Sequence, residues 1–134
     1  MNVLITGGGG FIGRHLMKEL SRTLHHIVAI SRNEIPGGDR VQVIKGNINR
    51  IEKFQEEIIQ FEPDVIIHLA WEGIPDFSAS ICGANLVNSI NFFNILLENT
   101  DCKKIIISGS CFEYGKQQGP CKESEPVNIN SYFT

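Results

Sequence analysis

The sequence predicts an α/β protein built on a doubly wound parallel sheet. Three observations support this class: short apolar runs without polar alternation, helical apolar spacings between them, and their regular succession along 134 residues. Runs that do not alternate indicate strands buried on both faces, as in a parallel sheet covered by helices. Because crossovers between parallel strands are right-handed, the economical order for five such strands is 3-2-1-4-5.

The first half of the chain contains three predicted strands. They are expected at residues 3–5, 27–30 and 41–44. A helix begins at Phe11 and ends near Thr23, because its apolar residues recur about once per turn. The segment Glu34–Asp39 is predicted to be a loop, since it contains a proline and two glycines.

The second half adds two more strands, each preceded by a helix. Apolar residues at intervals of three and four predict one helix from Ile51 to Phe61, which stops before Pro63. The remaining elements are a strand at 65–70, a helix at about 80–99 and a fifth strand at 104–108. After Gly115 the sequence becomes polar and rich in turn residues, and no sixth strand is predicted.

Charge and composition argue against several classes of partner. Twelve Lys and Arg against 15 Asp and Glu give 12 − 15 = −3, which does not favour nucleic acid. No apolar run approaches the ~20 residues of a membrane span, and the first residues do not resemble a secretory signal. We therefore expect a cytoplasmic protein without a membrane partner. The four cysteines lack metal-ligand spacing, so no metal site is predicted.

The glycine run after the first strand is typical of dinucleotide binding. Gly7, Gly10 and Gly13 recur between a predicted strand and a predicted helix, the context that this fingerprint requires. Gly7 permits a tight turn, Gly10 lets the backbone approach a pyrophosphate, and Gly13 allows the helix to pack on the sheet. Phe11 and Ile12 open the helix, whose free N–H groups would meet the phosphates. The alternative is a flexible glycine turn.

Four segments together show a family resemblance. They are Thr6–Gly13 as T-G-x-x-G-x-x-G, Pro63–Ala70 around the fourth strand, Ile106–Gly115 around the fifth, and Glu123–Tyr132. This combination resembles the extended short-chain dehydrogenase/reductases, the NAD-dependent epimerase/dehydratase family. The resemblance implies a Rossmann-like fold truncated before the later strands and the substrate domain. Residues 1–115 would form the dinucleotide-binding domain, and residues 116–134 the loop leading to the catalytic tyrosine.

The resemblance implies a nicotinamide cofactor, and the end of the second strand bears on which one. Folds that bind NAD usually place Asp or Glu about 20 residues past the glycines. Here the strand ends with Ser31 and Arg32. Arg32 can pair with a 2′-phosphate, which favours NADP over NAD, although an ordinary solvated arginine is the alternative. Further cofactor contacts implied by the resemblance are Asn47, Ile48, Leu69 and Ala70.

The resemblance assigns the catalytic chemistry to Ser110 and Tyr132. Ser110 would hydrogen-bond the reacting oxygen of the substrate, and Tyr132 would transfer its proton. A tyrosine with a pKa near ~10 is a base at neutral pH only when cations favour the phenolate. The family's lysine would be residue 132 + 4 = 136, beyond Thr134, so we expect this polypeptide to be catalytically incomplete. A loop-capping Ser110 and a partly buried Tyr132 are the alternatives.

The implied function is the NAD(P)-binding part of a nucleotide-sugar epimerase or 4-ketoreductase. The substrate of the full-length enzyme would be a nucleoside-diphosphate sugar. Dehydration is disfavoured because Ser110-Cys111-Phe112 replaces the Thr-Asp-Glu of the family's dehydratases. One alternative is a non-catalytic dinucleotide sensor or scaffold of the same fold. Another is a complete small protein whose fifth-strand edge pairs with a second copy to form a homodimer.

Overall fold

Five parallel strands pair in the order β3-β2-β1-β4-β5 in the computed structural model, which describes residues 1–115 and 119–127. The strands are β1 (Asn2–Thr6), β2 (His26–Ser31), β3 (Val41–Lys45), β4 (Val65–His68) and β5 (Lys104–Ile107). The order and the parallel direction confirm the predicted doubly wound sheet. The order reverses between β1 and β4, and ligands of such sheets bind at this point.

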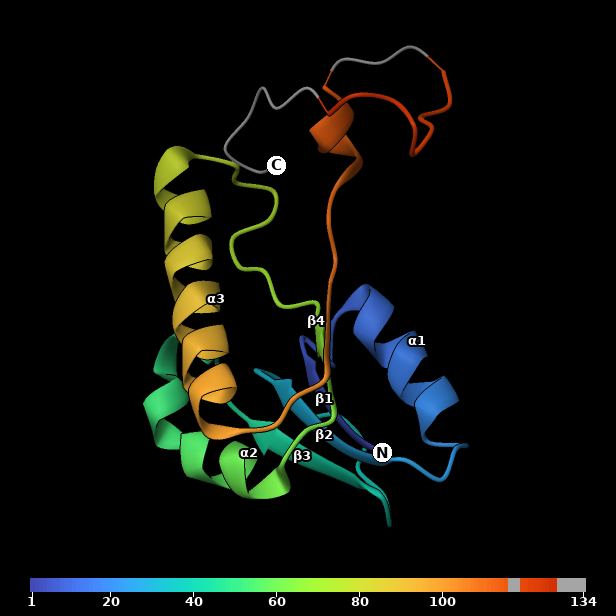
Figure 1. The fold of residues 1–134 in the computed structure, drawn as a ribbon, viewed down its shortest axis with the longest axis vertical. Helices are drawn as coiled ribbons and strands as arrows, with labels where there is room; N and C mark the ends of the chain where they lie inside the picture. Colours follow the sequence, from blue (N-terminus) through green and yellow to red (C-terminus); the bar gives the residue numbers. More distant parts are fainter. Residues whose placement is uncertain (116–118, 128–134) are drawn as a thin grey trace.

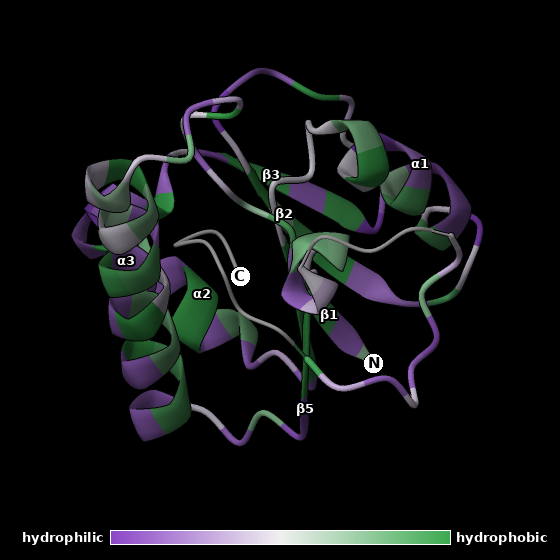
Figure 2. Ribbon diagram, turned by 90° about the horizontal axis from the view of Figure 1, so that it is seen from above, coloured by the Kyte–Doolittle hydropathy of each residue, from purple (hydrophilic) through white to green (hydrophobic). Residues whose placement is uncertain are grey.

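Helices cover both faces of the sheet (Figures 1 and 2). They are α1 (Phe11–Leu20), the 3-10 helix η1 (Ile48–Lys53), α2 (Gln55–Phe61) and α3 (Ala79–Asn99). The 3-10 helix η2 (Cys111–Tyr114) follows β5 and lies away from the sheet (Figure 1). Figure 1 shows α1 on one side of the sheet and both α2 and α3 on the other. The sheet is therefore the middle layer of three.

Successive residues of the central strands divide the core into two halves. Val3 and Ile5 of β1 join a cluster with Met17 of α1. Leu4, between them, joins a second cluster with Phe92 of α3. Because neighbouring side chains of a strand point to opposite faces, a strand covered on both faces must be apolar throughout.

The single helix predicted for residues 51–61 is wrong. The chain instead forms η1 and α2, separated at Phe54, whose φ of −146° and ψ of 10° are not helical. The break brings the buried Phe54 ring against Gly46 at the end of β3, where an added Cβ would lie 2.5 Å from the ring. Ile51 and Ile58 remain fully buried on either side of the break.

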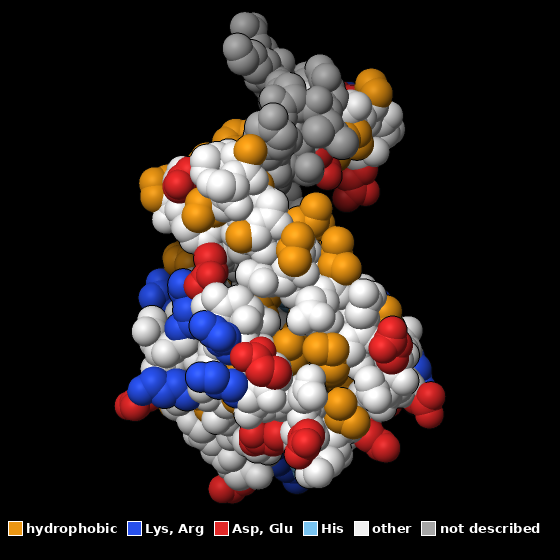
Figure 3. Space-filling view, turned by 90° about the vertical axis from the view of Figure 1, so that its left-hand side faces the viewer, with side chains coloured by type: hydrophobic (Ala, Val, Ile, Leu, Met, Phe, Trp, Pro, Cys, Tyr) orange, Lys and Arg blue, Asp and Glu red, His pale blue; other side chains and the backbone are white. Residues whose placement is uncertain are grey.

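α3 is the one helix within 1–115 and 119–127 that is long and apolar enough to be a candidate membrane span. It satisfies this criterion because most of its polar residues are uncharged, which a search for continuous apolar runs overlooks. Phe92 and Leu96 of α3 are fully buried in the core, while 22% of the apolar stretch of the helix is buried as a whole. Figure 3 shows the α3 side of the molecule, where hydrophobic side chains are exposed. Exposed apolar residues of α3 include Leu86, Val87, Ile90 and Leu97.

Candidate functional site

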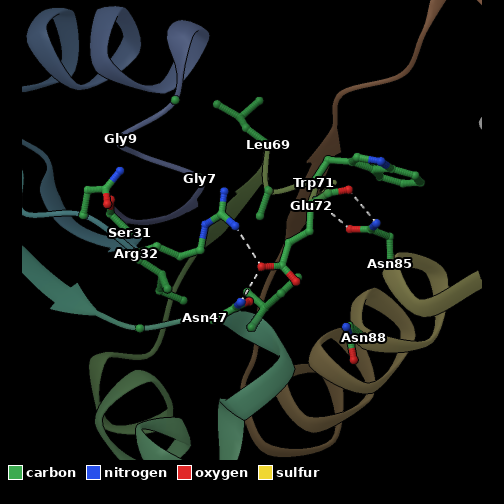
Figure 4. A pocket seen from close by; sticks show the side chains of 16 residues that line it. Gly7, Gly9, Ser31, Arg32, Asn47, Leu69, Trp71, Glu72, Asn85 and Asn88 are labelled. Carbon is green, nitrogen blue, oxygen red and sulfur yellow. Dashed lines mark hydrogen bonds and ion pairs between the residues drawn. The ribbon is translucent and has the colours of Figure 1, made fainter. Parts of the chain in front are cut away.

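A cavity of ≈ 330 Å³ opens at the carboxyl ends of the central strands (Figure 4). It lies where the strand order reverses, between the residues that follow β1, β2, β3 and β4 and the start of α3. The predicted cofactor residues that line it are Gly7, Gly10, Ser31, Arg32, Asn47, Ile48, Leu69 and Ala70. The fold thus brings residues from four separate segments of the chain to one cavity.

Gly7 makes the turn that leads out of β1. Its φ of +73° is in the region that favours glycine, and an added Cβ would lie 2.9 Å from Ala70 N and Leu69 C. Its own N–H donates to the carbonyl of Ile30 in β2 at 3.0 Å. The turn therefore lies close to the segment leaving β4 and is tied to β2.

Gly10 and Gly13 differ in what surrounds them. Gly10 is the N-cap of α1, and an added Cβ would meet only Gly7 O, at 3.2 Å. A Cβ on Gly13 would lie 2.2 Å from the same oxygen. Gly13 therefore packs the helix on the turn, whereas Gly10 leaves open space at the edge of the cavity.

The start of α1 offers backbone donors rather than side chains. Phe11 is 74% exposed and Ile12 is 59% exposed, and neither lines the cavity. The first N–H groups of an α-helix have no acceptor within the helix, and the helix dipole makes this end positive. Gly10 has no side chain to cap them. A glycine cradle of this kind fits a diphosphate.

Arg32 is paired with a carboxylate that sequence reasoning missed. Its NH1 donates to Oε1 of Glu72 at 2.9 Å, and its side chain is 61% exposed. Ser31 is buried, and its Oγ would lie 2.5 Å from a Cβ placed on Gly9. Of the two β2 residues, Arg32 therefore reaches across the cavity while Ser31 supports the glycine turn.

Glu72, Asn85 and Asn88 also line the cavity and were not predicted. Asn47 Nδ2 donates to Oε1 of Glu72 at 2.6 Å, and Asn47 Oδ1 accepts from Asn49 N at 3.3 Å. Glu72 lies four residues beyond His68, the last residue of β4. Its position shortly after a strand end, at the point where the strand order reverses, was the available signal. The two asparagines lie on α3, and their spacing of three places them on one helical face.

His68 joins the strands beneath the cavity. Thr6 Oγ1 lies 2.9 Å from its Nδ1, and Ser89 Oγ of α3 lies 3.0 Å from its Nε2. Burial lowers the pKa of His68 to about 4, so the ring is neutral at neutral pH. Thr6 Oγ1 also accepts from Ala70 N at 3.2 Å, which fixes the chain as it leaves β4.

Ser110, the predicted catalytic residue that the structure describes, does not line the cavity. Ser110 Oγ accepts from Phe112 N at 3.2 Å and caps η2, which is the contact expected of a loop-capping hydroxyl. Tyr132 lies outside the described residues. Both catalytic roles therefore stay predictions.

Acidic, cysteine and histidine side chains form no metal-binding cluster of three or more within residues 1–115 and 119–127. The four cysteines are free thiols. Cys82 is buried, while Cys111 and Cys121 are exposed.

The parallel sheet, the glycine turn and the cavity at the order reversal define a dinucleotide-binding fold of the Rossmann type. Residues 3–134 match the NAD dependent epimerase/dehydratase family, and the chain belongs to that family. This match confirms the resemblance noted in the sequence.

Two proteins are similar to this chain in sequence, and a third is similar in fold. A UDP-glucose 4-epimerase of Cyamopsis tetragonoloba is 28% identical, with 97% of this chain and 42% of that protein covered. The dTDP-4-dehydro-6-deoxyglucose reductase of Escherichia coli is 30% identical, with 93% and 44% covered. The Bordetella bronchiseptica enzyme WbmG, solved in complex with NAD, superimposes with a TM-score of 0.82 at 20% identity, with 99% and 45% covered. The chain spans less than half the length of each.

Proposed function

We propose that this chain is the nicotinamide-dinucleotide-binding part of an enzyme acting on nucleotide sugars, either an epimerase or a 4-ketoreductase. Family membership supports this proposal, and the similar proteins include both a UDP-glucose 4-epimerase and a dTDP-sugar reductase. The observation that carries it is the glycine turn at the mouth of the cavity, where Gly7 and Gly10 leave backbone exposed to a ligand.

The residues that line the cavity suit the parts of a dinucleotide. The turn from Gly7 to Gly10 and the start of α1 would hold the diphosphate. Asn47 and Ile48 lie beyond the end of β3, at the side of the cavity that would take the adenosine. When bound, the nicotinamide accepts hydride from the sugar or returns it.

We assign the substrate chemistry to the hydroxyl groups of Ser110 and Tyr132. Ser110 would hold the reacting oxygen of the sugar by a hydrogen bond, and Tyr132 would move the proton at that oxygen. In the structure Ser110 Oγ already accepts from Phe112 N, which leaves its own proton available for donation.

Replacement of Tyr132 tests the enzymatic part of the proposal. In the full-length protein, Tyr132→Phe should lower kcat about hundredfold or more with a nucleoside-diphosphate sugar, because positioned proton transfer contributes about that much. Calorimetric affinity for the nicotinamide dinucleotide should be unchanged. The matched control is Tyr114→Phe, since Tyr114 is the only other tyrosine of the chain.

The two other outcomes separate the alternatives. Dinucleotide binding without turnover of any nucleotide sugar by the unmodified protein would favour a sensor or scaffold of the same fold. If the protein bound neither NAD nor NADP, the proposal as a whole would be overturned.

A further inference from the structure

We infer that Glu72 makes this site select NAD over NADP, an inference that rests on the proposed function. β2 ends without the carboxylate that NAD-binding folds usually place there to accept the ribose 2′-hydroxyl. The structure brings a carboxylate to the same end of the sheet from β4 instead. Glu72 Oε1 lies 2.9 Å from Arg32 NH1, at the tip of the side chain that reaches across the cavity from the end of β2 (Figure 4).

Two donors from two different strand ends hold this carboxylate. Arg32 follows β2 and Asn47 follows β3, and both donate to the same oxygen, Oε1. Among the residues that the structure describes, no hydrogen bond reaches Oε2. Oε2 is therefore an acceptor available to a hydroxyl group of a ligand in the cavity.

The main chain of Glu72 is also held in place, by two hydrogen bonds to the side chain of Asn85. Its N–H donates to Asn85 Oδ1 at 2.8 Å, and its carbonyl accepts from Asn85 Nδ2 at 3.0 Å. Asn85 is 5% exposed and also donates to the carbonyl of Ile81. α3 therefore holds the position of Glu72 through a buried amide.

The charge of Glu72 opposes a 2′-phosphate in two ways. The carboxylate neutralises Arg32, the cation that a 2′-phosphate would use. It also places a like charge beside any phosphate that approaches Arg32. A ribose 2′-hydroxyl meets neither obstacle, because a carboxylate accepts its hydrogen bond. Arg32 considered alone favours NADP, whereas Arg32 paired with Glu72 favours NAD.

The test compares NAD and NADP binding by isothermal titration calorimetry in four proteins. They are the unmodified protein, Glu72→Gln, which keeps the side-chain length without the charge, the double variant Glu72→Gln/Arg32→Gln, and the control Glu34→Gln. Glu34 pairs with Lys45 at 3.1 Å, is 88% exposed and does not line the cavity. Glu72→Gln and Glu34→Gln therefore remove the same charge, the first inside the site and the second outside it.

We expect NAD to bind the unmodified protein about tenfold more tightly than NADP, or better. Glu72→Gln should reduce that ratio about tenfold, ~1.4 kcal/mol, mainly through tighter NADP binding, and Arg32→Gln added to it should remove the gain. Glu34→Gln should leave the ratio unchanged. A preference of the unmodified protein for NADP, or an unchanged ratio in Glu72→Gln, would overturn this inference alone. Binding of neither dinucleotide would overturn the proposed function with it.

Discussion

Gly10 and Gly13 lie one helical turn apart and illustrate two reasons for a glycine. A Cβ on Gly13 would lie 2.2 Å from Gly7 O and 2.8 Å from Gly8, all of it backbone that cannot rotate away. A Cβ on Gly10 would meet Gly7 O at 3.2 Å and nothing else within 4 Å. Its φ of −73° and ψ of 177° are also accessible to alanine. Gly13 is therefore needed by the fold, and Gly10 by a ligand.

Alanine substitutions should separate these two roles. Gly13→Ala should destabilise the protein by about 3 kcal/mol or more, measured by urea unfolding, because overpacking against rigid backbone is costly. Gly10→Ala should keep nearly all of its stability but bind nicotinamide dinucleotides at least about tenfold more weakly. Gly38→Ala is the control, since a Cβ there would meet nothing within 4 Å. Unchanged binding by Gly10→Ala would contradict the assignment of the turn.

The sequence was informative for the glycine turn but not for its electrostatic surroundings. The turn is local, so spacing alone locates Gly7, Gly10 and Gly13 between a strand and a helix. The partners of Glu72 are 40 and 25 residues away, at the ends of other strands. Only the register of the sheet brings them together, and no single-segment pattern contains that information.

The strands were predictable from the sequence, but the break inside one predicted helix was not. All five strands were found because each is a short apolar run. The break between η1 and α2 was missed because Ile51, Phe54 and Ile58 keep helical spacing across it. Apolar spacing indicates which residues face the core. A kink that keeps the same residues facing the core does not change the spacing, so the sequence pattern does not reveal it.

Gly83 offers a test at the level of one helix. It lies within α3, is exposed, and an added Cβ would meet nothing within 4 Å. Gly83→Ala should therefore stabilise the protein by ~0.5–1 kcal/mol, because glycine is a poor helix former. The neighbouring exposed Ala84 provides the reverse change, and Ala84→Gly should destabilise by a similar amount. Loss of stability in Gly83→Ala, measured by urea unfolding, would show that this face of α3 is covered.

At the scale of the whole molecule, His68 of β4 links the two central strands, β1 and β4, to α3. Its ring contacts Thr6 of β1 and Ser89 of α3 and packs against Phe92 and Phe93, at ring-centroid distances of 5.7 and 5.0 Å. His68 is 4% exposed, and its burial disfavours the charged form of the ring. Protonation of this one side chain therefore affects three elements together.

Stability should fall in mild acid because of His68. The unfolded chain takes up this proton near pH 6.5, whereas the folded protein takes it up only near pH 4. The unfolded state thus binds more protons between these values, so the contribution is complete above pH 6.5 and is lost as the pH falls to 4. The loss is about 3 kcal/mol. Urea unfolding at a series of pH values should show it.

Substitution of His68 provides the control for that titration. His68→Gln should reduce the dependence of the unfolding free energy on pH between 6.5 and 4, even if its stability is lower throughout. His26→Gln, at an exposed position, should keep the full dependence of the unmodified protein. An identical dependence in His68→Gln would assign it to other groups.

Apolar surface also remains open at the edge of the sheet. Ile106 and Ile107 of β5 are 42% and 59% exposed, and β5 is the last strand in the order. Within residues 1–115 and 119–127 no further strand pairs with the outer edge of β5, and an edge of this kind can bind one. A homodimer formed through it stays a prediction, which the molar mass from light scattering would test.

The pairing of Arg32 with Glu72 has a practical consequence for redesign of the protein. An attempt to exchange one nicotinamide coenzyme for the other by editing the loop after β2 alone would leave the opposing charge in place. Two distant codons must be altered jointly, and libraries that randomise neighbouring positions would never sample the combination.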